Sequence, residues 1–450
     1  MNGSLVLLLV LFVTYALFSR RLGTSSVTGP MLFMVAGLVA AWIVVGGGSA
    51  AAVLQLELSN ETIQVLLEGT LVIVLFSDAV LIDYRAVRSE ATIPTRLLGI
   101  GLPLTIIAGT AAAMLLFPGL GFWPAAIIAI ILAPTDAALG QAVLANRSVP
   151  AAVRQGLSVE SGLNDGIAVP FLAIAVAGAA DELQTGSEIA TLFLSEIGLA
   201  IVVGVIVGRG GSWLLAACMS RGWMGGEGRR VLVVMLALLA YALADPIGGS
   251  GFIAAFVGGL TFGRFVRSNY PDITRFSEAV SHLLTMTSFF IFGALILGPV
   301  LGEVDWRVVA YAVISLTLVR MIPVAISLIG TRSDVRTQMY IGWFGPRGLA
   351  SLVFVGTVVL ESGLPFAEEV ILVVAVTVGG SVLAHGITAW PLSNTYGRWF
   401  ASMADEDMED MAEALTVEYM PRRGVTNQMH APMGGGIGAP GEGGRDSEPQ

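Results

Sequence analysis

Apolar segments long enough to cross a lipid bilayer recur along most of the chain. A transmembrane helix needs about 20 apolar residues, and about thirteen segments approach this length. They lie at residues 4–19, 29–47, 62–82, 97–117, 122–145, 150–178, 188–208, 229–245, 249–266, 279–301, 306–330, 337–360 and 368–391. Only 12% of the residues are charged, whereas soluble domains carry about 25%. The sequence therefore predicts an all-α polytopic membrane protein with about thirteen transmembrane helices.

Charge alternates between successive predicted loops. The odd-numbered loops carry arginines: Arg20, Arg21, Arg85, Arg88, Arg96, Arg147, Arg154, Arg209, Arg221, Arg229, Arg230, Arg264, Arg267, Arg275, Arg332 and Arg336. The even-numbered loops are acidic, with Arg307 as their only base. Because basic loops stay on the cytoplasmic side, we expect a multi-pass protein of the cell inner (plasma) membrane with its N-terminus outside and its C-terminus in the cytoplasm.

The last part of the chain differs in composition from the rest. Residues 402–418 are acidic with a helical apolar spacing, and residues 431–445 are mostly Gly, Pro and Ala. We therefore predict a transmembrane domain at 1–400 and a cytoplasmic tail at 401–450 that is acidic, then Gly-rich, and largely disordered. The net charge of −10 speaks against nucleic-acid binding, and the single cysteine, Cys218, excludes an internal disulfide. Membrane lipid is the expected surrounding, and no cofactor is expected.

Two predicted spans are interrupted at equivalent positions in the two halves of the chain. Pro134-Thr135-Asp136 falls within 122–145, and Gly345-Pro346-Arg347-Gly348 falls within 337–360. A proline inside a span disrupts the helix, and such backbone persists in a membrane where it lines a cavity. We therefore expect two inverted six-helix repeats with discontinuous crossing helices. Asp136 and Arg347 would then offset the dipoles of the half-helices.

Ionisable side chains within these spans are the candidate functional residues. Carboxylates inside a bilayer are costly and usually lie on an ion or proton pathway. Residues four apart share a helix face, which places Glu160 beside Asn164 and Ser161 beside Asp165. Four acids against two bases leave negative charge that protons or metal ions would neutralise. The residues counted are Asp78, Asp136, Glu160, Asp165, Arg320 and Arg347.

Asp165 is the predicted carboxylate for a transported ion. Its buried charge has no committed arginine, so we expect either a cation or a proton to neutralise it. Hard cations prefer oxygen ligands, and Ser161, Thr135 and Asp78 could supply these to a transported Na⁺. Asn164 and Asp136 complete the predicted cation- and proton-binding set. If the protein changes sides only when the carboxylate is neutralised, competition between Na⁺ and H⁺ produces exchange.

Glu160 is expected to have a structural role. We expect an ion pair with Arg320 that fixes Asn164 and holds the site open; Arg347 is the other possible partner, and the sequence does not choose between them. With one titrating carboxylate and its neighbour paired, exchange of one Na⁺ for one H⁺ without net charge movement is favoured. Asp78 and Asp136 also have structural interpretations, as half-helix caps or as arginine partners.

Glu160-Ser161-Gly162-Leu163-Asn164-Asp165-Gly166 resembles the Asn-Asp signature of the monovalent cation:proton antiporter-1 family, which includes the NhaP-type sodium/proton antiporters. Thr135-Asp136 is similar to that family's Thr-Asp, and Asp78 stands where members usually have glutamate. Arg320 and Gly345-Pro346-Arg347-Gly348 resemble the family's two membrane arginines. The resemblance covers residues 1–400. It implies the sodium/proton antiporter fold, an elevator-like motion, a homodimer and electroneutral exchange.

Two other classes of function fit parts of the sequence. A passive monovalent cation channel would also place acids in the membrane. Gly248-Gly249-Ser250-Gly251 fits the Gly-x-Ser-Gly of rhomboid-like intramembrane serine proteases, with His282 or His385 as the base. The protease interpretation leaves every buried carboxylate unexplained. We therefore expect an antiporter and not an enzyme, with Li⁺ or K⁺ as alternatives to Na⁺.

Overall fold

A computed structural model of the chain describes residues 3–22, 25–45, 60–82, 92–136, 139–140, 143–144, 146–180, 186–266, 273–331, 333–361 and 366–403. The chain divides into two compact units, Met1–Val417 and Glu418–Gln450, and every described residue belongs to the first. The predicted acidic and Gly-rich tail, apart from residues 401–403, lies outside the described residues.

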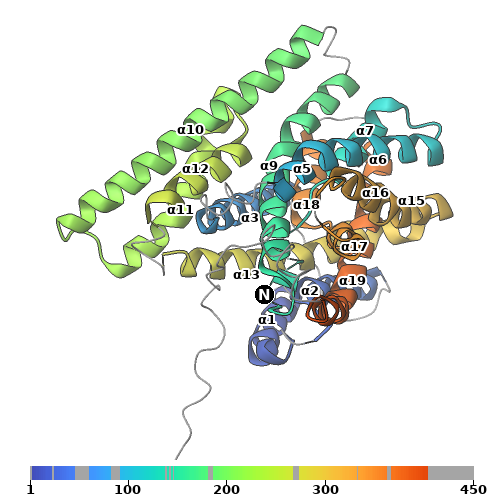
Figure 1. The fold of residues 1–450 in the computed structure, drawn as a ribbon, viewed down its shortest axis with the longest axis horizontal. Coiled ribbons are helices and arrows are strands. Elements are labelled where there is room, and N and C mark those ends of the chain that lie inside the picture. Colours follow the sequence, from blue (N-terminus) through green and yellow to red (C-terminus); the bar gives the residue numbers. More distant parts are fainter. Residues whose placement is uncertain are drawn as a thin grey trace, which may run out of the picture. The chain divides into compact units, whose positions relative to one another are not determined.

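Regular secondary structure in the described ranges is entirely helical (Figure 1). The main helices are α1 (Gly3–Leu22), α2 (Gly29–Val45), α3 (Asn60–Leu81), α5 (Thr92–Arg96), α6 (Leu102–Leu116), α7 (Phe122–Ile131), α9 (Ala151–Ala179), α10 (Gly186–Ser220), α11 (Gly226–Ala244), α12 (Gly251–Val266), α13 (Arg275–Ile291), α15 (Trp306–Leu316), α16 (Leu318–Ser327), α17 (Val335–Trp343), α18 (Leu349–Glu361) and α19 (Ala367–Phe400). Short π-helical turns, Leu97–Gly101 and Phe292–Leu297, continue α5 and α13.

Each predicted span contains one of these helices or a broken helix. Nine helices of the described part are long and apolar enough to cross a membrane, and shorter apolar helices lie at Gly29–Ile43, Phe122–Ile131 and Gly251–Val266. The predicted all-α polytopic fold is confirmed.

One group of helices is formed by α3, α10, α11 and α12, which pack on one another. Small residues set the closest contacts, as is common between membrane helices. A side chain on Gly208 of α10 would collide with the backbone of Gly258 in α12. On another face of α12, a side chain on Gly259 would collide with the backbone of Phe76 in α3. These glycines allow α12 to lie tightly between α10 and α3.

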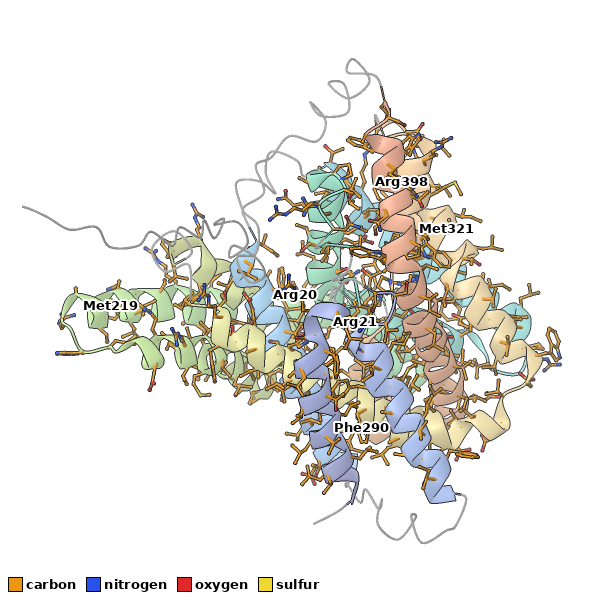
Figure 2. The ribbon with its side chains drawn as sticks, turned by 90° about the horizontal axis from the view of Figure 1, so that it is seen from below. Arg20, Arg21, Met219, Phe290, Met321 and Arg398 are labelled. Atoms are coloured by element: carbon orange, nitrogen blue, oxygen red, sulfur yellow. The ribbon has the colours of Figure 1, made fainter. Side chains whose placement is uncertain are left out.

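A second group contains α6, α7 and α15–α19, and α9 contacts both groups. α9 packs against α7, α17 and α18 on one side and against α3, α10 and α12 on the other. Figure 2 shows side chains on both groups, with Met219 near the end of α10, Met321 on α16 and Arg398 near the end of α19. Because α9 contains Glu160, Ser161, Asn164 and Asp165, the candidate residues lie where the two groups meet.

Candidate functional site

Two broken helices meet at the site. α7 ends at Ile131 and is followed by non-helical residues 132–136, while residues 344–348 separate α17 from α18. The backbone N–H of Asp136 donates to the carbonyl of Pro346 at 2.7 Å. The discontinuous helices expected from the two proline-containing motifs are present, and the two breaks contact each other directly.

Asp136 caps the half-helix that begins on the opposite side of the crossing. Its Oδ2 accepts a hydrogen bond from the backbone N–H of Leu349 at 2.8 Å. A carboxylate at a helix N-terminus satisfies a free N–H and opposes the helix dipole. Gly348 lies so close that a side chain there would collide with this carboxylate. Of the roles considered for Asp136, the geometry fits the helix cap.

Arg347 performs the converse task at the end of α7. The guanidinium is fully buried, and its Nη1 donates to the carbonyls of Ala133 and, at 3.0 Å, Pro134. A positive charge at a helix C-terminus is favourable because it opposes the partial negative charge of the free carbonyls. Asp136 of the first break therefore stabilises the second break, and Arg347 of the second break stabilises the first.

Glu160 is paired with Arg320. Two parallel hydrogen bonds join them, from Nη1 to Oε1 at 2.6 Å and from Nη2 to Oε2 at 2.9 Å. Both side chains are only 3% exposed. Bidentate arginine–carboxylate pairs are among the strongest charge-assisted contacts. Of the two partners that the sequence left open for Glu160, the structure places Arg320 in contact.

Three polar side chains form a small buried cluster between the first break and α9. Thr135 Oγ1 lies 2.9 Å from Ser161 Oγ, and Asn164 Nδ2 donates to Thr135 Oγ1 at 2.8 Å. Asn164 was expected to be held by Glu160, which lies one turn away; its amide instead holds Thr135. The cluster brings two hydroxyl oxygens together, and hard cations prefer oxygen ligands.

Asp165 lies one turn from Ser161 on α9 and is only 7% exposed. Its Oδ1 and the Oδ1 of Asn164 have no hydrogen-bond partner among the described residues. Asp136 and Asp78 act on Asp165 by charge repulsion. Buried polar atoms are nearly always hydrogen-bonded, so this acceptor marks a place that a cation or a proton can occupy.

Asp78 comes from α3 and is partly buried. Within the described ranges, no three His, Cys, Asp or Glu side chains gather closely enough to hold a metal ion. A cation at Asp165 therefore needs hydroxyl, amide or backbone oxygens, such as those of Thr135 and Ser161, among its ligands.

The residues of the alternative protease are engaged elsewhere. Ser250 Oγ accepts from the backbone N–H of Ile253 at 3.3 Å, at the start of α12. His282 contacts the hydroxyl of Tyr15 at 3.3 Å. The ring nitrogens of His385 contact Ser381 and Trp343. In the described part of the chain neither histidine is hydrogen-bonded to Ser250, so the local sequence match is explained by helix capping.

The structure adds residues that the sequence analysis did not place at the site. Ser351 Oγ donates to the carbonyl of Ile131 at 2.7 Å, at the end of α7. Ser381 accepts from the backbone N–H of Arg347 and lies one turn from His385 on α19. The i, i+4 spacing of Ser381 and His385 in an apolar span could have identified them from the sequence, because buried polar side chains need hydrogen-bond partners.

Comparison with known proteins agrees with this fold. The K(+)/H(+) antiporter NhaP2 of Shewanella sp. (strain MR-4) is 28% identical over 268 residues, which cover 59% of this chain and 45% of the relative. The K(+)/H(+) antiporter NhaP of Alkalimonas amylolytica is 24% identical, covering 78% of this chain and 60% of the relative. The chain thus spans about half the length of the curated relatives it matches.

The solved structure of the sodium proton antiporter MjNhaP1 from Methanocaldococcus jannaschii superimposes with a TM-score of 0.68 at 19% identity, covering 88% of this chain and 97% of that one. This likeness shows a shared fold. The sequence profile described as "Sodium/hydrogen exchanger, transmembrane" matches residues 7–395. The chain therefore belongs to the transmembrane sodium/hydrogen exchanger family.

Proposed function

We propose that this chain is a secondary antiporter that exchanges a monovalent cation for a proton across the cell membrane. The observation that carries the proposal is the contrast between Asp165 and Glu160. Both are buried on α9, but Glu160 is neutralised by Arg320, whereas Asp165 Oδ1 has no hydrogen-bond partner among the described residues. A buried carboxylate of this kind needs a cation or a proton for neutrality.

The proposed mechanism is competition at one carboxylate. When a cation occupies the site, Asp165 supplies the charge, and Ser161, Thr135 and Asp78 supply further oxygens. When a proton binds Asp165, the cation has lost its counter-charge and leaves. Exchange follows if only the neutralised site moves between the two sides, because an empty charged site is too costly to carry through the membrane interior.

Na⁺ is the proposed cation, with K⁺ and Li⁺ as alternatives. A protein named probable Na(+)/H(+) antiporter from Schizosaccharomyces pombe is 28% identical over 253 residues, covering 53% of this chain and 33% of that protein. The bacterial relatives are named K(+)/H(+) antiporters. These names leave the choice of the transported cation to measurement.

Exchange of one cation for one proton is supported by the contacts of the charged residues near Asp165. Glu160 and Arg320 compensate each other, and Asp136 is held at the N-terminus of α18. Arg347 is bonded to the free carbonyls of α7. With Asp165 as the single titrating carboxylate of the cycle, each half-cycle carries one positive charge and the exchange is electroneutral.

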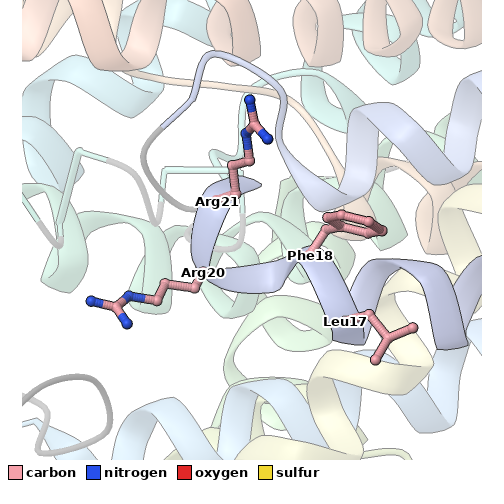
Figure 3. A pocket seen from close by; sticks show the side chains of 4 residues that line it. All are labelled: Leu17, Phe18, Arg20 and Arg21. Carbon is pink, nitrogen blue, oxygen red and sulfur yellow. The ribbon is translucent and has the colours of Figure 1, made fainter.

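The proposal extends to assembly and orientation. We propose a homodimer with an elevator-like motion of the helices around the crossing, and an external N-terminus. Support for the orientation comes from the arginines at helix ends, since basic residues favour the cytoplasmic side. Arg20 and Arg21 extend from the C-terminal end of α1, where they line a small pocket with Leu17 and Phe18 (Figure 3).

The test uses everted membrane vesicles with an acidic interior. In vesicles containing the wild-type chain, addition of Na⁺ should dissipate the pH gradient, whereas Asp165→Asn should abolish the response at similar protein levels. Asp305→Asn is the matched control, because Asp305 caps α15 at an exposed position and asparagine is also a good cap. Repeating the assay with Li⁺ and K⁺ determines the preference. Full exchange by Asp165→Asn would overturn the proposal.

A further inference from the structure

His385 is a fully buried titratable side chain that the proposed exchange cycle does not use. It lies in the middle of α19 and is 1% exposed. Its Nε2 lies 2.9 Å from the carbonyl oxygen of Trp343, the last residue of α17. Its Nδ1 lies 3.1 Å from Ser381 Oγ and 2.9 Å from the Ser381 carbonyl, one turn earlier on its own helix.

These contacts form a complete chain of hydrogen bonds for a neutral imidazole. A neutral imidazole carries one N–H, and each of its ring nitrogens lies near a carbonyl, which only accepts. With the proton on Nε2, this nitrogen donates to Trp343, and Nδ1 accepts from the Ser381 hydroxyl. That hydroxyl can donate because its oxygen accepts from the backbone N–H of Arg347 at 2.6 Å. Every donor along this chain has an acceptor.

The hydrogen bonds of His385 and Ser381 hold two residues at the break between α17 and α18. Trp343 is the last residue before the break, and Arg347 lies four residues later, within it. His385 fixes the first and Ser381 fixes the second. Free backbone groups at a broken helix need such partners inside a membrane, and one turn of α19 supplies them for both sides.

The position of Arg347 in turn determines the geometry at the other break. Its side chain holds the carbonyls of Ala133 and Pro134, and the next residue is Thr135, whose hydroxyl contacts Ser161 and Asn164. A shift of the Arg347 backbone therefore moves a proposed cation ligand. Direct contacts therefore lead from Ser381 on α19, through Arg347 and the first helix break, to Thr135 and Ser161.

We propose that His385 and Ser381 form a clasp that positions the crossed helix breaks, and through them Thr135, for cation binding. The inference rests on the proposed antiport function, because its main readout is the apparent KM for the transported cation. His385 is a positioning residue in this account, since it acts through Ser381, Arg347 and Thr135 and does not touch the ion.

The variants separate the clasp from simple loss of packing. His385→Leu fills similar space without hydrogen bonds and should raise the apparent KM for Na⁺ about five- to ten-fold, as expected for loss of hydrogen bonds to buried backbone groups. His385→Gln places an amide N–H where Nε2–H was and should stay within about two-fold of wild type. Thr377→Val is the control, because Thr377 is fully buried on α19 and its hydroxyl donates to the carbonyl of Val373 within that helix.

Ser381→Ala combined with His385→Leu tests whether the two residues act as one unit. Residues in one hydrogen-bond network couple, so the double variant should resemble the more damaging single variant in apparent KM. The clasp would be overturned by any of three results. The first is an apparent KM in the double variant that rises by the product of the two single effects. The others are a wild-type KM for His385→Leu and a His385→Gln variant as impaired as His385→Leu.

Hydrogen exchange of purified protein supplies a readout that does not require transport. Peptides covering residues 132–136 and 344–352 should exchange faster in His385→Leu and Ser381→Ala but not in Thr377→Val. If wild-type vesicles show no exchange activity, the proposed function fails, and this measurement still decides whether the clasp exists. If wild type transports and neither KM nor amide protection changes in the variants, the clasp alone fails.

Discussion

The buried pair of Glu160 and Arg320 gives the sharpest stability prediction. Glu160→Gln removes one charge and leaves Arg320 in a site where it is 3% exposed. The guanidinium has little room to reach water, because Gly345 lies so close that a side chain there would collide with it. Its Nε already lacks a partner among the described residues. The orphaned charge must therefore remain buried.

Removing one partner of a buried ion pair costs about 3–5 kcal/mol. Two hydrogen bonds, at 2.6 and 2.9 Å, connect the pair, so the upper part of this range is expected for Arg320→Ala, which strands the carboxylate. If the two losses were independent, Glu160→Gln with Arg320→Gln would cost about 6–10 kcal/mol. Because the double variant leaves no buried charge, its cost should instead be no greater than that of either single variant.

The assay is the unfolding of purified protein in detergent, induced by heating or by denaturant at fixed protein concentration. Asp305→Asn serves as a control for the loss of an acid at an exposed position. Both single variants should unfold at clearly lower temperature, and the double variant should recover part of the loss. Wild-type stability in the single variants, or additive losses in the double variant, would refute the idea of a structural pair.

Three further predictions concern packing, orientation and charge movement. Gly348→Ala should lower stability by about 0.5–2 kcal/mol by displacing the Asp136 cap, while Gly356→Ala in α18, where a side chain would meet nothing, should be neutral or stabilising; equal melting temperatures for all three proteins would contradict the capping role. Cys218, the single cysteine, is partly exposed near the end of α10, so a membrane-impermeant maleimide should label it in everted vesicles and not in intact cells, with Cys218→Ser as control; the reverse pattern would invert the proposed orientation. Proteoliposomes on a solid support should give no sustained current on a Na⁺ jump, and a sustained current would exclude one-for-one exchange.

Much of the fold could be predicted from hydropathy and loop charge. The span boundaries agree because apolar length is a property of the sequence itself, and Pro134 and Pro346 reveal the two breaks for the same local reason. α19 continues to Phe400, beyond the predicted span at 368–391. Polar ends beyond the bilayer remain helical, which a hydropathy window does not detect.

The sequence alone could not predict which charged residues of different helices pair with each other. Glu160 could meet Arg320 or Arg347, since spacing along one helix says nothing about which residue of another helix faces it. The expectation that Glu160 holds Asn164 was reasonable from their i, i+4 spacing. In the folded chain Thr135 comes nearer, because the first break brings its hydroxyl to α9. Likewise, Ser381 and His385 acquire their roles only when α19 packs beside the second break.

The central claim is that a cation and a proton exclude each other at Asp165. The most direct test adds Na⁺ to purified, weakly buffered protein and records proton release together with cation binding. The account predicts saturable release of about one proton per cation bound, as expected for competition at a single carboxylate, and no release from Asp165→Asn. Cation binding without proton release, or unchanged release from Asp165→Asn, would contradict it.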